Sequence, residues 1–571
     1  MIEHGPGLEA QSARITASKW QIIALLMAIG LALIFPAGAS LTAFYLNRQD
    51  IVLLGLGLVL LAICAWRLTP RALPLSGHRL LLPGGALLLL LACLAGHYML
   101  LGGYDLSRDE QMVSFDAEVF RSGHLVAALP AMWRDGAEAL NTSFMYPALT
   151  RGAWISNYLP GNAALQALAG RLTGPLLSAL GLAALWGCVR RIWPEDRELP
   201  VIALLLYIGS GQIVLTGMTS YAMSGHLALN LVWLWLFLRG SWRMDVAALA
   251  VGFLATGLHQ PLMHPMFAAP ILFLCLYERQ WPRATLYLAG YAIIGAFWLW
   301  WPGWTWGLVQ AGVAPVQPEG VGFSSRLVQT VMAGGAERIP NMLANLLRFV
   351  AWQHLLLLPL FALGIAGLRT KRLMMALAVG VALSVAVMFI ILAYQGHGFG
   401  YRYLHGLIGS CILIALHGWK QLGGAIAWWR PLLVRTTIAG LVLSLSLQAW
   451  MAHQFYAPYA QASARIEASD ADYIVIQPDA APFAQDLVIN RPDLSNRPIR
   501  LDGTAVTPGL VARLCHQSVG QDRPRAAFVG NGALADIRAY FGLAGHEDAA
   551  RRDASLARSF AAAGCRLEKL D

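Results

Sequence analysis

One polar segment of the chain gathers carboxylates in a pattern that could support acid–base chemistry. It reads DLSRDEQMVSFDAEVFRSG from position 105 to 123 and contains the adjacent pair Asp109 and Glu110. Ser107 and Glu110 fit an S-x-x-E capping box, so we expect a helix from about Arg108 to Ser122.

The apolar stripe of this predicted helix consists of Met112, Phe115 and Val119. At about 100° per residue, Asp109 and Asp116 project almost together beside the stripe, whereas Glu110 points roughly a quarter turn away. On a helix lying at a membrane surface, Asp109 could touch a lipid headgroup. The simpler alternative is structural: Glu110 only completes the cap, and Asp109 only favours the positive end of the helix.

Two further segments could join the same site. The stretch NYLPGNAALQALAGR, from Asn157 to Arg171, is a second amphipathic segment that closes the loop. The stretch YQGHGFGYRYLH, from Tyr394 to His405, places Arg402 among aromatic residues and glycines near the outer end of an apolar block.

The elements that must position these residues are membrane spans. Of the 571 residues, 57% are hydrophobic and 13% are charged, with a mean hydropathy of +0.56, whereas soluble domains carry about 25% charged residues. The net charge of +10 argues little for nucleic acid, because the basic residues form small clusters between apolar blocks, as orientation signals do. We therefore expect a multi-pass membrane protein.

Apolar blocks predict about thirteen spans. They are Trp20–Leu46, Ile51–Trp66, Leu80–Leu101, Pro175–Val189, Leu199–Leu215, Ala222–Leu238, Val246–Leu258, Pro265–Leu276, Ala284–Trp301, Phe349–Leu368, Leu373–Tyr394, Leu407–Trp419 and Thr436–Trp450. With the amino terminus in the cytoplasm, basic clusters such as Arg190 and Arg191 fall into cytoplasmic loops, as the positive-inside rule requires. The expected location is the bacterial inner membrane.

This orientation places three longer segments outside: Gly102 to about Gly174, Pro302 to about Arg348, and the tail from His453. The predicted division is a transmembrane domain at residues 1–452, with its first periplasmic loop at about 102–174, and a soluble periplasmic domain at 453–571. The tail alternates short apolar runs with Pro, Asp and Asn, which predicts a small α/β domain. In that compartment Cys515 and Cys565 could form a disulfide, or they could be two buried thiols.

Together these motifs resemble the GT-C glycosyltransferases. The resemblance rests on the Asp-Glu pair opening a helix in a long first outer loop, the Tyr158-Leu-Pro-Gly return, the late Arg402-Tyr403 motif and a charge-poor bundle. In style it is similar to the dolichyl-phosphate-mannose protein mannosyltransferases and the bacterial transferase that adds aminoarabinose to lipid A. The implied fold class is mainly α: a polytopic transmembrane helical bundle with amphipathic periplasmic loop helices and a small C-terminal α/β domain.

The resemblance implies transfer of a sugar from a polyprenyl-phosphate carrier to a lipid, glycan or protein acceptor at the outer face, with inverting attack. Asp109 is then the general base, Glu110 orients or supports it, and Arg402 neutralises the leaving phosphate. Secondary phosphate or sugar contacts are implied at His405, Tyr401 and Tyr403, with membership of an interfacial aromatic belt as the alternative.

Other polar residues are weaker candidates for substrate contact. They are Asp116, Tyr158, Tyr221, His226, His259 and His264, with Asn162 beside the donor tail. His226 could instead be a helix-packing residue. No cofactor is expected; a metal between His259 and His264 lacks a nearby carboxylate, although a divalent ion stays open. The resemblance leaves a second phosphate ligand unassigned, and Arg151, Arg326, Arg338 and Arg348 are candidates by charge alone.

Two other functions compete with this reading. A polysaccharide polymerase or ligase would use a large late loop rich in Arg and His, but the segment 302–348 contains no His. A transporter would place charges at the midplane of broken helices, and the predicted spans are nearly free of charge. A lipid flippase remains an alternative.

Overall fold

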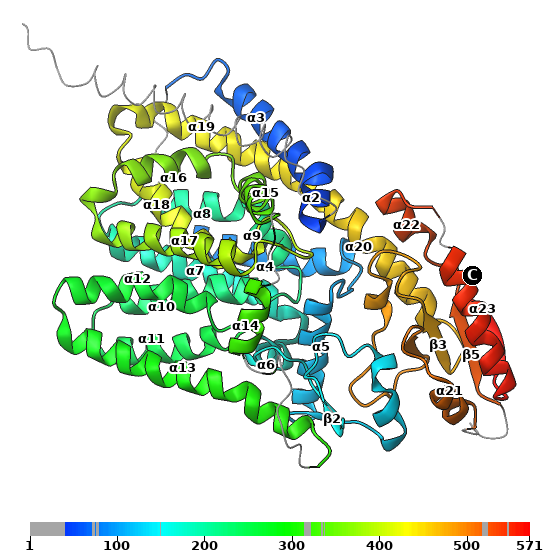
Figure 1. Ribbon diagram of the computed structural model, residues 1–571. Helices are drawn as coiled ribbons and strands as arrows, with labels where there is room; N and C mark the ends of the chain where they lie inside the picture. Colours follow the sequence, from blue (N-terminus) through cyan, green and yellow to red (C-terminus); the bar gives the residue numbers. More distant parts are fainter. Residues whose placement is uncertain are drawn as a thin grey trace, which may run out of the picture.

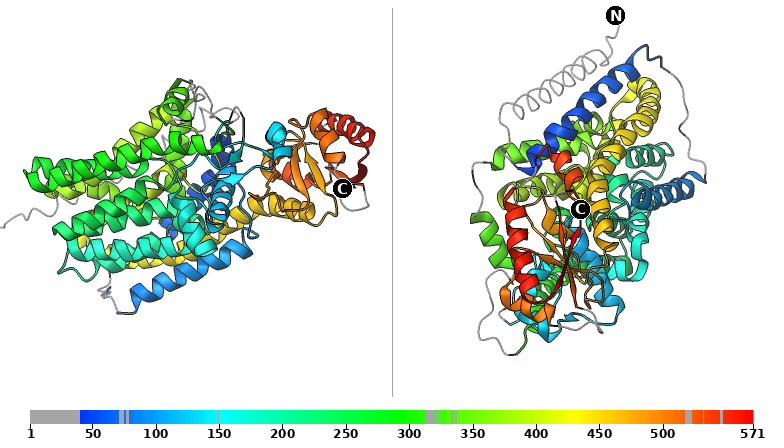
Figure 2. Two further views of the ribbon diagram at one scale, coloured as in Figure 1. Left: turned by 90° about the horizontal axis from the view of Figure 1, so that it is seen from below. Right: turned by 90° about the vertical axis from the view of Figure 1, so that its right-hand side faces the viewer.

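The computed structural model describes residues 40–570, apart from 71–74, 76–78, 149, 313–320, 322, 333–334, 336, 517–522, 531 and 545–546. Most described residues form helices that pack side by side in one bundle, and a smaller domain containing a β-sheet lies at one end of it (Figure 1). The view from below in Figure 2 shows the long helix that joins the two parts.

The bundle is built from a series of apolar helices. They are α2 (Leu41–Tyr45), η1 (Leu46–Asp50), α3 (Ile51–Ala65), α4 (Leu81–Met99), α7 (Thr173–Ile192), α8 (Leu199–Ile208), α9 (Gly211–Thr216), α10 (Met223–Phe237), α11 (Trp242–Thr256), α12 (Met263–Tyr277), α13 (Trp281–Val309), α16 (Leu357–Ala366), α17 (Arg372–Ile391), α18 (Ile408–Lys420), α19 (Ile426–Ala439), η7 (Gly440–Ser444) and α20 (Leu445–Glu467). Two of its long helical runs each contain one π-helical turn, η1 between α2 and α3 and η7 between α19 and α20.

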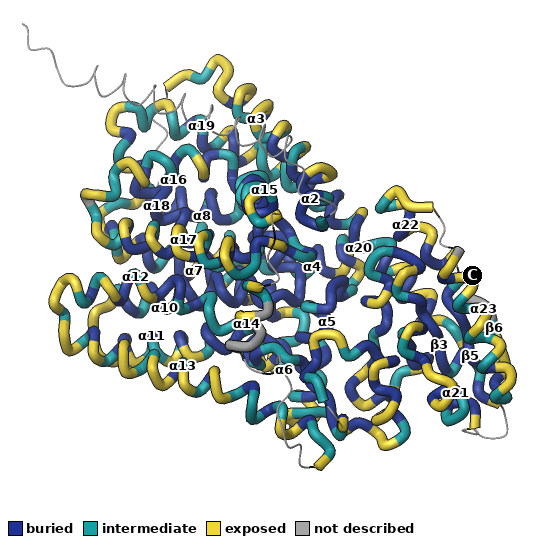
Figure 3. The backbone as a smooth tube through the Cα atoms, viewed as in Figure 1, coloured by how far each residue is buried: buried dark blue, intermediate teal, exposed yellow. Residues whose placement is uncertain are grey.

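Six helical runs among the described residues are long and apolar enough to cross a membrane. They are Leu41–Ala65, Leu81–Met99, Gly161–Ile192, Trp281–Val309, Arg372–Ile391 and Gly423–Glu467. Large apolar side chains on their outer faces are exposed, for example Leu88 at 67% and Ile293 at 71%, whereas the bundle interior is buried (Figure 3). An apolar surface of this kind suits lipid rather than water. The chain is a multi-pass membrane protein, but the expected thirteen spans are not confirmed.

Several predicted spans differ from the observed helices. The predicted span Leu199–Leu215 is interrupted at Ser210, whose side chain caps the short helix α9 by accepting a hydrogen bond from Ile213 N. The predicted span Phe349–Leu368 is wrong at its start, because Phe349 belongs to a separate helix that ends at Ala351. Apolar content alone cannot locate such breaks, because polar caps and turns set them. The predicted first span lies almost entirely outside the described residues.

Short helices and a small hairpin cover one end of the bundle. They are α5 (Arg108–Arg121), α6 (Gly161–Ala169), α14 (Phe323–Met332), α15 (Arg338–Ala351), the 3-10 helix η2 (Ala131–Leu140), and the paired strands β1 (Ala127–Ala128) and β2 (Ala153–Trp154). Helix α5 confirms the helix predicted from Arg108, and its capping box is complete: Ser107 accepts from Glu110 N, and Glu110 accepts from Ser107 N.

The C-terminal part holds a parallel sheet with strand order β4-β3-β5-β6. Its elements are β3 (Tyr473–Ile476), β4 (Ile499–Asp502), β5 (Arg525–Val529), β6 (Arg566–Leu570), α21 (Pro508–Cys515), α22 (Ala535–Phe541) and α23 (Glu547–Ala562). All four side chains of β3 are buried, as expected of a parallel strand with covered faces. Cys515 and Cys565 form a disulfide. Helix α20 runs on to Glu467, so it passes through the predicted division between residues 452 and 453.

Candidate functional site

Asp109 and Arg402 meet where the outer layer covers the bundle. Asp109 lies in the first turn of α5, and Arg402 begins the 3-10 helix η5 (Arg402–Leu407), which leads into α18. Arg402 Nη1 is 2.6 Å from Asp109 Oδ2, and the two side chains are only 11% and 14% exposed. The fold therefore brings into contact the two residues expected to act as base and phosphate ligand.

A second donor holds the other oxygen of Asp109. The hydroxyl of Tyr158 donates to Oδ1, and the Tyr158 ring lies against His259 with centroids 4.0 Å apart. Burial acts to raise the pKa of Asp109, but the charge of Arg402, the nearby His259 and the hydrogen bonds outweigh it and lower the pKa to about 2. In this arrangement Asp109 is ionised at neutral pH.

Arg402 is fixed by its own loop and by aromatic rings. Its Nη1 also donates to the carbonyl of His397 at 3.1 Å, and its backbone N–H donates to Gln395 Oε1 at 2.9 Å. The guanidinium carbon lies 5.5 Å from the ring centre of Tyr221 and 5.3 Å from that of Tyr403. These cation–π contacts and hydrogen bonds point the guanidinium toward α5.

A buried ion pair braces the loop before Arg402. Arg348 Nη2 donates to the carbonyl of Gly398 at 3.0 Å, while Arg348 Nε lies 3.0 Å from Asp50 Oδ2. Both side chains are fully buried, and Trp352 Nε1 donates to Asp50 Oδ1. Arg348 is thus engaged internally rather than presented to a ligand. Sequence reasoning missed Asp50, because it lies in the polar stretch between two predicted spans, whereas the structure continues one helical run through it, Leu41–Ala65.

Glu110 turns away from its neighbour. Its Oε2 accepts from Ser107 N at 3.2 Å and from the Tyr456 hydroxyl at 3.1 Å. Ser107 Oγ in turn lies 2.7 Å from the Tyr221 hydroxyl. Burial, reinforced by Asp105, raises the pKa of Glu110 to about 8. Within the described residues, no hydrogen bond joins Glu110 to Asp109, so any support that Glu110 gives passes through the start of α5.

Asp116 shares a face of α5 with Asp109, as the helical spacing predicts. It accepts hydrogen bonds from the backbone N–H and the hydroxyl of Ser156. Burial raises its pKa to about 7, although both hydrogen bonds act in the opposite direction. One short segment, from Ser156 to Tyr158, therefore holds both carboxylates, and Asp116 serves to anchor that segment.

The histidines separate into two groups. His264 is a bridge between helices, because its Nδ1 is 2.8 Å from Asn230 Oδ1 and its Nε2 is 2.7 Å from the Tyr291 hydroxyl. His226 and His405 are buried, and neither ring of these two has a hydrogen-bond partner within the described part of the chain. One small pocket next to the ion pair is lined by Arg402 and Tyr403 and by two of the histidines, His226 and His259.

Tyr401 and Asn162 have structural contacts. The Tyr401 ring is fully buried, and its carbonyl accepts from Gln212 Nε2 at 3.0 Å. Asn162 Nδ2 donates to the carbonyl of Ser220 at 2.9 Å and so ties α6 to the turn before α10.

An apolar groove of about 410 Å³ reaches the same 3-10 helix from within the bundle. Its walls come from α3, α15, α16 and α17, for example at Leu53, Phe349 and Val385. Leu404, two residues after Arg402, also lines it. The groove has room for an apolar chain next to the turn that holds the guanidinium.

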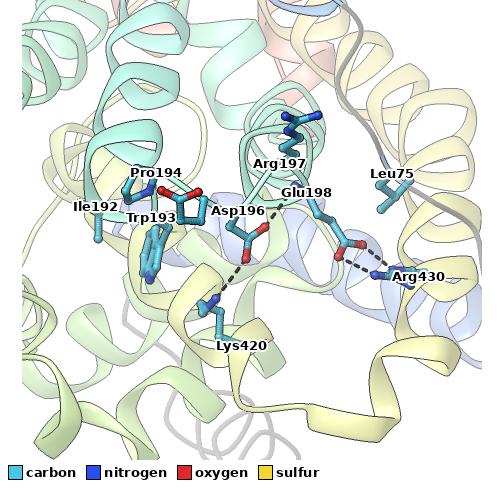
Figure 4. A pocket seen from close by; sticks show the side chains of 10 residues that line it. Leu75, Ile192, Trp193, Pro194, Asp196, Arg197, Glu198, Lys420 and Arg430 are labelled. Carbon is cyan, nitrogen blue, oxygen red and sulfur yellow. Dashed lines mark hydrogen bonds and ion pairs between the residues drawn. The ribbon is translucent and has the colours of Figure 1, made fainter.

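A larger pocket of about 690 Å³ lies at the end of α18 that is farther from Arg402. Figure 4 shows the side chains that line it. Asp196 pairs with Lys420 at 3.1 Å, and Glu198 pairs with Arg430 at 2.6 Å. These pairs join the ends of neighbouring helices. Because Lys420 ends the helix that Arg402 leads into, this pocket is not part of the Asp109 site.

Solved structures that are similar to this chain include ArnT and an archaeal oligosaccharyltransferase. ArnT from Cupriavidus metallidurans bound to undecaprenyl phosphate aligns with a TM-score of 0.49 and 13% identity, over 72% of this chain and 84% of that chain. The oligosaccharyltransferase from Archaeoglobus fulgidus in the apo form aligns with a TM-score of 0.41 and 12% identity, over 81% of this chain and 69% of that chain. Both alignments have TM-scores below 0.5 and sequence identities of 13% or less. No protein-family model and no curated protein sequence matches the chain.

Proposed function

We propose that this chain is a membrane glycosyltransferase that moves a sugar from a polyprenyl-phosphate carrier to an acceptor hydroxyl at the periplasmic face. The observation that supports the proposal most is the buried contact between Asp109 and Arg402, on a 3-10 helix that an apolar groove also reaches at Leu404. A permanently charged planar cation suits a phosphate, and an adjacent carboxylate suits a hydroxyl that must lose its proton.

The reaction follows from the placement of these two groups. The acceptor oxygen attacks the anomeric carbon while its proton passes to Asp109 Oδ, and the carbon–oxygen bond to the phosphate breaks. The bonding electrons leave with the phosphate oxygen, whose charge Arg402 neutralises. Attack opposite the leaving phosphate inverts the configuration at the sugar carbon. Every step uses side chains of this chain and the two substrates.

The ion pair also provides a way to activate the base on substrate binding. While Arg402 contacts Asp109, the low pKa of the carboxyl makes it a weak base. A donor phosphate that draws the guanidinium toward itself removes the largest charge that lowers this pKa. Asp109 then becomes more basic when the donor is in place.

The groove is the proposed site of the carrier's apolar tail. Its lining is almost wholly aliphatic and aromatic, and it opens among helices whose outer faces suit lipid. A polyprenyl chain lying there would place its phosphate near η5. The proposed orientation puts η5, α5 and the C-terminal domain in the periplasm of a bacterial inner membrane, where the Cys515–Cys565 disulfide is compatible with an oxidising compartment.

The direct test is sugar transfer by the purified full-length chain in lipid vesicles. Radiolabelled polyprenyl-phosphate sugars are supplied with an envelope extract as acceptor, and the unaltered protein is compared with Asp109→Asn. We expect loss of transfer by about 10²–10⁴-fold, the usual contribution of a general base. Asp135→Asn is a matched control, because Asp135 belongs to the same loop and is 86% exposed. Equal transfer by the Asp109→Asn and unaltered proteins would remove Asp109 from the reaction.

A further inference from the structure

A second cleft lies on the other side of α5, between this helix and the C-terminal domain. It has a volume of about 330 Å³ and is bounded by α5, by the last turn of α20 and by the loop 489–500. Figures 1 and 2 show α5 between the bundle and the C-terminal sheet. Arg108 lines this cleft, whereas the next residue, Asp109, points to Arg402.

The lining of the cleft is rich in cations. Five arginines contribute to it, two from the first outer loop and three from the C-terminal domain: Arg108, Arg171, Arg491, Arg497 and Arg500. Only three carboxylates line it, and each pairs with one of the arginines: Asp105 with Arg171 at 2.7 Å, Glu118 with Arg491 at 2.5 Å, and Glu467 with Arg500 at 3.3 Å.

Among the residues that the structure describes, Arg497 has no acidic partner, and Arg108 interacts electrostatically with the buried carboxyl of Asp486. Within the described residues, Arg108 and Arg497 form no ion pair; Arg108 donates to Asn141 and Ser143 carbonyls, and Arg497 donates to the carbonyls of Leu494 and Asn496. Backbone carbonyls satisfy donors but do not neutralise charge. The cleft therefore keeps an excess of positive charge that favours an anion.

A buried hydroxyl adds an independent sign of a ligand. The Tyr104 side chain lines the cleft, and its hydroxyl is buried with no hydrogen-bond partner within the described chain. It lies near enough to Arg500 and to the acids Asp486, Asp105 and Glu110 to interact with them electrostatically. Leaving a buried hydroxyl unpaired costs about 1–3 kcal/mol, so a partner is expected there.

We propose that this cleft binds an anionic group, a phosphate or carboxylate, on the acceptor. The assignment of the anion to the acceptor rests on the proposed glycosyl transfer, since the donor phosphate is assigned to Arg402. Arg108 lines the cleft and the next residue, Asp109, contacts Arg402, so the two sites are neighbours along α5. The acceptor must therefore carry its anionic group apart from the hydroxyl that attacks the sugar.

The test is binding of inorganic phosphate to the full-length protein in neutral detergent. Broadening of the ³¹P resonance measures this binding. The variant is Arg497→Gln, because Arg497 is exposed and can be changed without disturbing the core. Loss of one charge-assisted contact should weaken phosphate binding about tenfold. The control is Arg558→Gln, an exposed arginine on α23 that does not line the cleft. Equal phosphate affinity in the two variants would overturn the proposal.

Tyr104→Phe provides a second variant. Removing a buried, unpartnered hydroxyl should raise the unfolding temperature of the phosphate-free protein while weakening phosphate binding. A Tyr104→Phe protein that binds phosphate as the unaltered one does would remove the hydroxyl from the site.

Undecaprenyl phosphate distinguishes the two sources of the anion. Its affinity should be the same in the Arg497→Gln and unaltered proteins. If Arg497→Gln weakens undecaprenyl phosphate binding as much as it weakens inorganic phosphate binding, the cleft belongs to the donor and the acceptor proposal is overturned. If the unaltered protein binds no undecaprenyl phosphate, the proposed function fails, whereas the inorganic phosphate measurement still decides whether the cleft binds anions.

Discussion

Asp109 and Arg402 are 293 positions apart in the sequence, and their side chains meet at 2.6 Å in a nearly buried ion pair. Each charge would be costly in this place without the other, because burial removes most of its hydration. The pair therefore fixes the outer loop that contains α5 against the η5 turn. It also means that a donor phosphate must compete with a carboxylate for the same guanidinium.

The first prediction concerns the coupling of these two charges. Arg402→Gln leaves Asp109 buried without its main counter-charge, so we expect a loss of about 3–5 kcal/mol in the free energy of unfolding. Asp109→Asn in the same protein should recover much of this loss. A double-mutant cycle on thermal unfolding in detergent measures the coupling. Additive effects of the two substitutions would show that the ion pair contributes no coupling energy.

The second prediction separates the two adjacent acids. Burial raises the pKa of Glu110 to about 8, above its ordinary 4.5, so at pH 7 the side chain is mainly protonated and neutral. Glu110→Gln keeps this neutral state and an oxygen that can accept from Ser107 and Tyr456. We expect sugar transfer close to that of the unaltered protein, in contrast to Asp109→Asn. A loss as large as that of Asp109→Asn would make Glu110 the base.

Local sequence patterns predicted the features of the site that depend on one helix. The S-x-x-E pattern at Ser107 gave the start of α5, and helical periodicity placed Asp116 on the same side as Asp109. Such features need only neighbours in the chain. The resemblance to a family then suggested Arg402 as a ligand of the leaving phosphate, but not its ion pair with Asp109.

Contacts between distant segments could not be predicted in the same way. Nothing near Arg348 in the sequence indicates that Asp50 neutralises it, because the two lie on separate helices. His259 and His264 were treated alike from their spacing, yet the ring of His259 packs at a tilt against Tyr158, whereas His264 bridges Asn230 and Tyr291. These differences arise from helix packing, which periodicity does not determine.

The third prediction is a pH dependence of stability from Asp116. Its pKa is raised to about 7 from an ordinary 3.8, so the stability gained from holding the proton is fully present below about pH 4 and is lost as the pH rises through 7. The loss in the free energy of unfolding is at most about 4 kcal/mol. Asp116→Asn cannot titrate, so this variant should not show the loss. Thermal unfolding between pH 4 and 8 checks it.

Comparing Asp116→Asn with the unaltered protein removes the pH dependence that other buried acids contribute. Glu110 and Asp486, whose pKa values burial also raises, are present in both proteins, so the difference between them reports Asp116. Asp135→Asn, at an 86% exposed position, should follow the unaltered protein across the range. Parallel curves for Asp116→Asn and the unaltered protein would show that Asp116 does not keep its proton near neutral pH.

The last prediction distinguishes the roles of His259 and His264. His264→Leu leaves Asn230 Oδ1 and the Tyr291 hydroxyl without their partner, so we expect a loss of about 1–3 kcal/mol in stability. Undecaprenyl phosphate binding should change little, because neither of these contacts reaches Arg402. His259→Leu removes the ring against Tyr158, which holds Asp109, and should reduce transfer more than stability. Unfolding temperatures and transfer rates measured on the two variants would contradict this division if both variants lost stability and activity in the same proportion.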